Sequence, residues 1–179
     1  MTRLLLIIDI QRDYFPGGRY PLVGPDAAAD AASRLLAAFR AEGSPVIHVQ
    51  HVWDAPDAAF FAPGTPGVEI DARVAPEGDE PVLVKAQPNA FLGTELGSRL
   101  EEAAPDEVVI VGMMSSMCVD ATVRAASDLG YAVTVAHDAC AAPDLTFGDE
   151  SIPGAQVHAA FMAALADSYA LVTTVDELI

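Results

Sequence analysis

The stretch from Val108 to Tyr131, VVIVGMMSSMCVDATVRAASDLGY, limits the possible fold more than any other part of the sequence. It opens with an apolar, β-branched run that is typical of a buried strand, and it closes with a helical pattern that ends at Gly130. A short turn joins the two, with Cys118 at its far end. We therefore predict a strand, a tight turn and a helix, with a cysteine in the first turn of the helix.

Cys118 in that position is a candidate nucleophile. Backbone N–H groups and the positive end of a helix dipole favour the thiolate, which is the reactive form of cysteine. The small, flexible segment from Gly112 to Ser116 lets backbone amides converge on one point, as an anion-binding turn requires. The alternative is that a cysteine after a strand is only a small buried hydrophobe. Other parts of the chain have to decide between these interpretations.

Composition restricts the classes of protein to consider. A chain of 179 residues is long enough for one α/β domain with a full core, and we expect residues 1–179 to form a single domain. Although 52% of the residues are hydrophobic, no apolar run reaches the length of a membrane span.

The start of the chain lacks a secretory signal and there are two cysteines, which together predict that the protein is located in a reducing cytoplasm. A net charge of -17 argues against nucleic acid or anionic membrane as a partner.

Strand and helix patterns alternate along the chain. The predicted strands are Leu4–Ile10, Val46–Gln50, Val82–Lys85, Val108–Val111, Ala132–Ala136 and Ala170–Val175. Besides the helix after Cys118, we predict helices from Asp26, as the cap, to about Ala41, from Thr94 to Ala103 and from Gly154 to Asp167. This alternation favours a parallel sheet between two layers of helices. The loop region 51–80, rich in proline, glycine and aromatic residues, is interpreted as a lid, a pocket wall, an interface or a poorly ordered loop.

Three reactive side chains stand where predicted strands end. Asp9 follows the first strand, Lys85 ends the third and Cys118 follows the fourth. A carboxylate at the end of a buried strand is costly unless it has partners. In open α/β sheets the carboxyl edge is where ligands bind. An acid, a cation and a thiol at this edge together predict a catalytic site.

Five motifs carry a family resemblance over essentially the whole chain. They are LLLIIDIQRDYFPGG, KAQPNAFLGTEL, VGMMSSMCVDATVRAASDLGY, HDACAAPD and VHAAFMAALADSYALVTTVDEL. With these motifs the sequence resembles the isochorismatase-like cysteine hydrolases, which include nicotinamidases, carbamoylsarcosine amidohydrolase and streptothricin hydrolase. The resemblance implies a three-layer α/β/α fold with a six-stranded parallel sheet in the order 3-2-1-4-5-6. FFAPGTPGVEI together with GMMSSMCVDATVRAA resembles the streptothricin-hydrolase-like branch more than the nicotinamidase branch.

The resemblance also implies roles for individual residues. Cys118 matches the nucleophile, Asp9 the carboxylate that exchanges a proton with it, and Lys85 the cation that favours the charged pair. It further implies a cis peptide bond between Met113 and Met114, and an oxyanion hole made by the N–H groups of Met114 and Cys118. The implied activity is hydrolysis of a C–N bond in a small amide or lactam through a thioester, with no cofactor.

The resemblance and the residue pattern also assign places to further residues. By position in the resemblance, the pocket would be lined by Gln11, Tyr14, Phe60, Phe61, Asn89, Phe91 and Met117, each of which could equally belong to the core. Cys140 is interpreted as structural, His137 and Asp138 as fixing a loop, and His158 as a packing or interface residue. Apolar positions Val157, Phe161 and Leu165 on the last helix, together with the family resemblance, predict a homo-oligomer, a dimer or tetramer.

Two departures from related families leave alternatives open. Nicotinamidases carry an Asp-x-His and a further His after the second strand, which bind a metal; here the region is HVQHVWDAPDAAFF. His48 and His51 are three apart and would face opposite sides of a continuing strand, so we expect no metal and satisfied or solvent-facing imidazoles. Isochorismatases that cleave a vinyl ether typically lack the cysteine. The alternatives are a nicotinamidase that holds its ring by stacking alone, an isochorismatase-type hydrolase, and a non-catalytic oligomeric binding protein.

Overall fold

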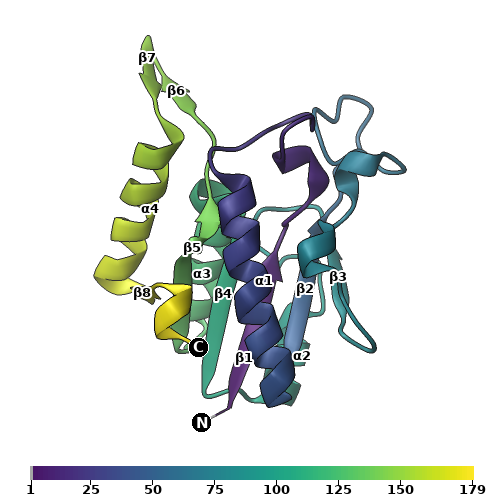
Figure 1. The fold of residues 1–179 in the computed structure, drawn as a ribbon, viewed down its shortest axis with the longest axis vertical. Coiled ribbons are helices and arrows are strands. Elements are labelled where there is room, and N and C mark those ends of the chain that lie inside the picture. The colour runs from purple at the N-terminus through teal and green to yellow at the C-terminus, as the bar shows by residue number, and fades with distance from the viewer. Residues whose placement is uncertain (1) are drawn as a thin grey trace.

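The chain forms a six-stranded parallel sheet covered by helices on both faces (Figure 1). The computed structural model describes residues 2–179. The sheet strands are β1 (Arg3–Ile8), β2 (Val46–His51), β3 (Val82–Lys85), β4 (Glu107–Met113), β5 (Val133–Ala141) and β8 (Leu171–Thr173). Their order is β3-β2-β1-β4-β5-β8, which confirms the predicted order because β8 is the sixth strand of this sheet.

One hairpin of the fold was not anticipated from the sequence. Strands β6 (Leu145–Phe147) and β7 (Glu150–Ile152) pair antiparallel and form a separate two-stranded sheet. Figure 1 shows this hairpin projecting beyond the N-terminal end of α4. Each strand has only three residues, too few for a periodic hydrophobic pattern to reveal it.

The helices divide between the two faces of the sheet. They are α1 (Pro25–Glu42), α2 (Leu96–Ala103), α3 (Asp120–Asp128) and α4 (Gly154–Ser168). Buried residues of α1 pack in one core cluster, while α2, α3 and α4 contribute to a second cluster on the other face. No helix within residues 2–179 has the length and apolar character needed to cross a membrane.

The start of α1 differs from the prediction. Gly24, with a φ of 69°, precedes the helix and Pro25 opens it, so no side chain caps this end. The proposed cap, Asp26, lies inside the first turn and its Oδ1 accepts a hydrogen bond from Arg73 instead. The end of the helix is as expected, because Gly43 takes the left-handed conformation that closes a helix.

The loop between β2 and β3 is packed against the body of the protein. It contains short 3-10 helices at Pro66–Val68 and Ala72–Val74, and the side chains of Phe61 and Val74 are buried. The buried carboxylate of Asp13 accepts hydrogen bonds from the backbone N–H of Phe61 at 2.7 Å and from that of Arg19 at 3.0 Å. A poorly ordered loop is therefore the wrong interpretation of this segment.

Two assignments near the C-terminal half need correction. Val157 and Leu165 on α4 are buried inside the chain itself, so they do not provide the free apolar face that the oligomer prediction used. Strand β5 extends to Ala141, which places His137 and Asp138 within a strand rather than a loop. Asp138 nevertheless anchors a following segment, because its Oδ1 accepts a hydrogen bond from the N–H of Val175.

The close approach of β1 and β4 requires a glycine. Gly112 pairs with Ile8 and has a φ of 138°, and a Cβ atom added to it would lie 2.0 Å from the Ile8 carbonyl oxygen. Directly after Ile8, the backbone of Asp9 adopts a φ of 50°, which is uncommon for a residue with a side chain. The backbone is thus tightly constrained at the point where the strand order reverses.

Candidate active site

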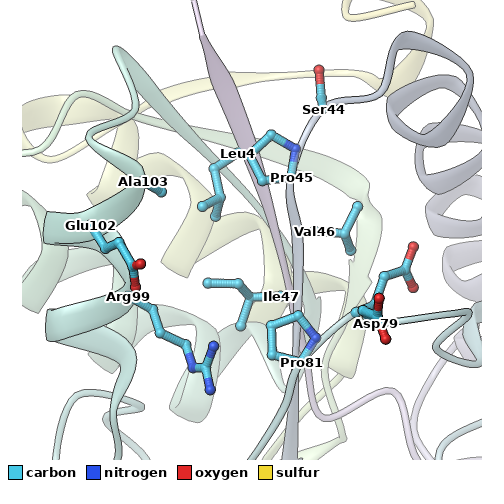
Figure 2. A pocket seen from close by; sticks show the side chains of 11 residues that line it. Leu4, Ser44, Pro45, Val46, Ile47, Asp79, Pro81, Arg99, Glu102 and Ala103 are labelled. Atoms are coloured by element: carbon cyan, nitrogen blue, oxygen red, sulfur yellow. The ribbon is translucent and has the colours of Figure 1, made fainter.

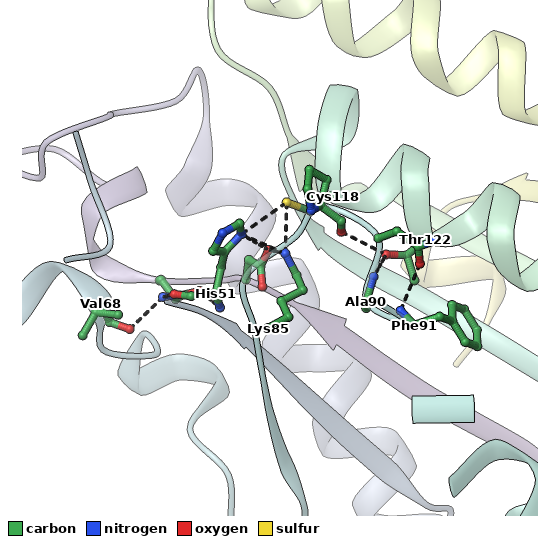
Figure 3. A network of polar contacts seen from close by, with 11 residues as sticks. His51, Val68, Lys85, Ala90, Phe91, Cys118 and Thr122 are labelled. Carbon is green, nitrogen blue, oxygen red and sulfur yellow. Dashed lines mark hydrogen bonds and ion pairs between the residues drawn. The ribbon is translucent and has the colours of Figure 1, made fainter. Parts of the chain in front are cut away.

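Four side chains meet at the carboxyl edge of the sheet, and Figure 3 shows three of them, His51, Lys85 and Cys118, converging on one point. Lys85 Nζ lies 2.7 Å from Asp9 Oδ2, 2.9 Å from His51 Nδ1 and 3.3 Å from Cys118 Sγ. The structure therefore brings together the three residues singled out in the sequence, Asp9, Lys85 and Cys118. It adds His51 as a fourth member.

The sheet register explains how these residues come together. His51 and Lys85 are register partners on the parallel strands β2 and β3, so their side chains extend from the same face. Asp9 follows directly after β1, the neighbour of β2 in the sheet. Cys118 lies in a π-helical turn, Ser115–Val119, which continues into α3 at Asp120. The cysteine is thus in the turn that opens the helix, as predicted, although the turn is wider than an α-helical one.

A buried hydrogen bond connects the segment after β3 to helix α3, which follows Cys118. The hydroxyl of Thr122, one turn beyond Cys118 on α3, accepts a hydrogen bond from the N–H of Ala90 at 3.1 Å (Figure 3). Thr122 is completely buried. Because Ala90 follows Lys85 closely in the sequence, this bond links the position of the lysine to that of the thiol.

All three N–H groups of the Lys85 ammonium have an acceptor. Asp9 Oδ2, His51 Nδ1 and Cys118 Sγ are each within hydrogen-bonding or ion-pair distance of Nζ. An ammonium has three donors and no acceptor, so its capacity is fully used. Lys85 is the only lysine in the sequence, and its side chain is buried.

Burial shapes the titration of the acid and the thiol. Burial raises the pKa of Asp9, and the nearby charge of Lys85 partly opposes this shift. Burial also raises the pKa of Cys118 far above its ordinary value; the charge of Asp9 raises it further, while Lys85 opposes. Burial therefore acts against the thiolate, which the sequence predicts the helix end to favour. Besides its ion pair with Lys85, Asp9 Oδ2 lies 3.8 Å from His51 Nδ1, and hydrogen bonding with Cys118 helps to lower the pKa of Asp9.

The structure agrees with the prediction of a satisfied imidazole at His51, because its Nδ1 lies 2.9 Å from Lys85 Nζ, but the sequence did not predict its place beside Cys118. Strand β2 does continue through His51, which sends His48 and His51 to different surroundings. His48 is buried and its Nε2 lies 2.9 Å from Glu80. His51 contacts Lys85 and lies 3.9 Å from the sulfur of Cys118. Its position at the end of a strand, like Asp9 and Lys85, was the signal that could have identified it.

Gln11 anchors His51 rather than simply lining a pocket. Its Oε1 accepts a hydrogen bond from the backbone N–H of His51 at 2.8 Å, and its Nε2 donates to the His51 carbonyl at 2.9 Å. The same Nε2 also donates to the carbonyl of Val68 at 2.7 Å. Gln11 is completely buried, so it joins β1, β2 and the long loop from inside the protein.

Aromatic residues of the proposed pocket form a packed group next to the site. The ring of Tyr14 lies 4.6 Å from that of Phe61 and 5.8 Å from that of Phe60, and both Tyr14 and Phe61 are buried. The Phe61 ring also lies 5.9 Å from the His51 ring. Phe61 therefore forms a fixed wall beside His51 and has no freedom to close over the site as a lid.

The remaining pocket candidates have different surroundings. Asn89 Oδ1 accepts a hydrogen bond from the N–H of Phe91, and Phe91 packs against the second core cluster. Met117 is 47% exposed, next to the almost completely buried Cys118. Of these three residues, Met117 is the one whose side chain is free to meet a ligand near the sulfur.

The turn before Cys118 contains the non-proline cis peptide bond between Met113 and Met114. The Met114 carbonyl accepts hydrogen bonds from the N–H groups of Met117 and Val119, which closes the turn. Met114 and Cys118 are both almost completely buried. The use of their N–H groups as an oxyanion hole stays a prediction.

The ligand atoms of Asp9, His51 and Cys118 all lie within 4.8 Å of one another, which is the spacing of a possible metal site. However, Lys85 Nζ lies within 3.3 Å of all three of these side chains. A metal bound by them would have to sit beside a buried ammonium, which is electrostatically unfavourable. The residues present therefore suit the lysine cation and do not fit a metal.

Two other features lie away from this cluster. A hollow of about 470 Å³ lies between the starts of β1, β2 and β3 and the end of α2, lined by residues that include Leu4, Ile47 and Arg99 (Figure 2). It contains neither a cysteine nor a histidine, and it lies at the opposite end of these strands from Cys118. Cys140 is buried and its thiol donates to the Ala136 carbonyl, in keeping with a structural role.

Known proteins with similar sequences and structures share this architecture. The isochorismatase domain family matches residues 3–177. YddQ, an isochorismatase family protein of Bacillus subtilis, is 49% identical over 98% of both chains. A streptothricin hydrolase of Streptomyces noursei is 36% identical over 96% of this chain and 62% of its own length. The crystal structure of an isochorismatase hydrolase from Oleispira antarctica superimposes with a TM-score of 0.95, at 50% identity over 99% of this chain and 95% of that one. The chain belongs to the isochorismatase family, whose members are isochorismatase-like hydrolases.

Proposed function

We propose that the protein is a cysteine amidohydrolase that cleaves a C–N bond in a small amide or lactam through a thioester. The observation that carries this proposal is the position of Lys85 Nζ, 2.7 Å from Asp9 Oδ2 and 3.3 Å from Cys118 Sγ. One buried cation thus contacts both the base and the nucleophile. A binding protein would gain nothing from this arrangement, because an acid, a cation and a thiol buried together are costly to keep.

The first half of the reaction acylates the enzyme. Asp9 accepts the proton of the Cys118 thiol, and Lys85 stabilises the thiolate that forms. The thiolate attacks the carbonyl carbon, and the N–H groups of Met114 and Cys118 hold the oxyanion. The C–N bond then breaks as Asp9 returns its proton to the departing nitrogen. The products of this half are an amine, or ammonia, and a thioester on Cys118.

The second half releases the acid. Asp9, again a carboxylate, takes a proton from a water molecule that attacks the thioester carbonyl. The C–S bond breaks and the proton returns from Asp9 to the sulfur of Cys118. The raised pKa of Asp9 suits this work, because a carboxylate that accepts and returns a proton near neutral pH needs a pKa above its ordinary value.

A Cys–His dyad is the competing assignment of the base, and the geometry disfavours it. His51 Nδ1 lies 3.9 Å from Cys118 Sγ, beyond the usual distance between a nucleophile and its base. The same nitrogen lies 2.9 Å from Lys85 Nζ, so its lone pair already accepts a hydrogen bond. Asp9 therefore remains the base in this proposal.

The test is hydrolysis of a panel of small amides and lactams, with nicotinamide and a streptothricin included, by wild type, Cys118→Ala and Cys140→Ala. The Cys140 variant is the matched control, because it removes the other buried thiol of the chain. We expect acid products from wild type and from Cys140→Ala, and none from Cys118→Ala. Hydrolysis that survives in Cys118→Ala would contradict the proposal. A wild-type protein that hydrolyses nothing and whose Cys118 resists alkylation would favour a binding protein.

A further inference from the structure

We propose that His51 has two roles: its Nδ1 holds Lys85 in place, and its Nε2–H donates a hydrogen bond to a substrate atom beside the scissile carbonyl. The second role rests on the proposed amidohydrolase function. It narrows the substrate class to amides that carry a hydrogen-bond acceptor, such as a carbonyl oxygen, on the carbon next to the scissile group.

The first step is the tautomer of His51. Lys85 Nζ can only donate hydrogen bonds, and it lies 2.9 Å from His51 Nδ1. Nδ1 must therefore be the acceptor nitrogen, and in a neutral ring the proton then lies on Nε2. Burial and the charge of Lys85 lower the pKa of His51 to about 4, so the ring is neutral near pH 7.

The second step is the fixed position of the ring. Gln11 holds both the backbone N–H and the backbone carbonyl of His51, at 2.8 and 2.9 Å. Phe61 packs beside the ring, and the ring nitrogen Nδ1 is fixed by Lys85. A side chain anchored at its backbone and at its ring is preorganised for recognition.

The third step is the free donor. Within residues 2–179 the hydrogen bonds of the His51 ring all involve Nδ1 and none involves Nε2. The His51 side chain is 15% exposed, whereas those of Asp9 and Lys85 are completely buried. His51 is thus the polar member of the cluster, apart from the thiol, that a substrate can reach. Its free N–H favours a substrate with an acceptor and disfavours one with a cationic group.

The fourth step places the acceptor on the substrate. The scissile carbon must come within bonding distance of Cys118 Sγ, which lies 3.9 Å from the near nitrogen of the His51 ring. The scissile oxygen is assigned to the N–H groups of Met114 and Cys118. The Nε2–H of His51 is therefore left for an atom on the neighbouring carbon.

Two variants separate the roles. His51→Asn places an amide oxygen near the position of Nδ1, which can still accept from Lys85, but it has no donor at the position of Nε2. His51→Gln places an amide N–H near the position of Nε2 but lacks the acceptor for Lys85. The two variants are similar in polarity, so each serves as the control for the other.

The holding role is tested without any substrate. Lys85 lowers the pKa of Cys118, so displacement of Lys85 should raise the apparent pKa of thiol alkylation by iodoacetamide. We expect a wild-type pH profile for His51→Asn and a profile shifted to higher pH for His51→Gln. In the wild type, nitrogen-15 NMR of the labelled histidines should show His51 protonated on Nε2 alone at pH 7. A proton on Nδ1, or an unshifted profile in His51→Gln, would overturn this role.

The recognition role is tested with pyruvamide, which has a carbonyl oxygen beside its amide, and isobutyramide, which has a methyl group there. We expect the ratio of kcat/KM for pyruvamide to that for isobutyramide to fall about tenfold in His51→Asn, the effect of one lost hydrogen bond. The ratio should stay near the wild-type value in His51→Gln even if both rates fall. An unchanged ratio in His51→Asn would overturn the recognition role. Failure of the wild type to hydrolyse either amide would overturn the substrate class, while the alkylation and NMR results would still decide the holding role.

Discussion

Lys85 Nζ and Asp9 Oδ2 lie 2.7 Å apart, and both side chains are completely buried. Few charged side chains are fully buried in proteins unless they are paired, because removal of an ion from water is costly. The ion pair therefore stabilises the edge of the sheet, and it is also part of the proposed chemistry. This double role leads to the first prediction.

Lys85→Met should lower the free energy of unfolding by about 3 to 5 kcal/mol, because it leaves a buried carboxylate without its partner. The double variant Asp9→Asn with Lys85→Met should recover part of this loss, since no charge then remains at the site. Urea denaturation measures both. Arg34→Met is the control: it removes one side of the exposed pair with Asp176, which solvent screens, and should change stability much less than Lys85→Met. A double variant less stable than Lys85→Met alone would contradict the prediction.

Asp9→Asn should separate hydrolysis from thiol reactivity. Loss of the proton acceptor should reduce turnover by on the order of 100-fold to 10,000-fold. The charge of Asp9 raises the pKa of Cys118, so its removal should shift the alkylation of this thiol by iodoacetamide to lower pH. Rates of alkylation across pH 6 to 10, with mass spectrometry to identify the labelled cysteine, provide the measurement. A shift toward higher pH would show that Asp9 does not act on the thiol through its charge.

Stability should depend on pH through His51. The pKa of His51 is about 4 in the folded protein, below the value of 6.5 that an unperturbed histidine has in the unfolded chain. Between these two pH values the unfolded chain therefore binds more protons than the folded protein. The contribution of neutral His51 to the free energy of unfolding is therefore fully present above about pH 6.5, and it is lost as the pH falls toward 4. Urea denaturation at pH 5 and at pH 7.5 should show a smaller difference in His51→Gln than in wild type. His48 and His158, whose pKa values are also lowered, remain in both proteins and do not affect the comparison. Equal differences in the two proteins would be the contrary result.

Gly112→Ala should disrupt the site through the backbone. The added Cβ would lie 2.0 Å from the Ile8 carbonyl oxygen, so β1 would have to move away from β4 and displace Asp9. Gly130→Ala is the matched control, because Gly130 has a φ of 90° but nothing within 4 Å of an added Cβ. We expect a loss of about 1 kcal/mol for the control and a larger loss, together with lost turnover, for Gly112→Ala. Thermal unfolding and amide hydrolysis measure the two effects, and equal losses of stability in both variants would contradict the clash.

Several parts of the fold and site could be predicted from local sequence. Continuous apolar runs identify the buried strands β1 and β4, and a glycine identifies the end of helix α1. These signals are readable because strand burial and helix termination leave their marks in neighbouring residues of the sequence. Asp9, Lys85 and Cys118 were identifiable because each ends an apolar run or follows one. The short strands β6 and β7 carry too little local pattern to be recognised.

The family resemblance of the motifs specified the strand order, and the sequence by itself identified Asp9, Lys85 and Cys118 as candidate catalytic residues. Tertiary structure alone decided what surrounds them. His51 joins the site because the register of β2 on β3 pairs it with Lys85, and register depends on contacts between distant segments. The raised pKa of Cys118 likewise follows from burial, which no local pattern near the cysteine reveals. The reactive groups are thus local features of the chain, whereas their distances, protonation and partners arise only when separate strands are brought together.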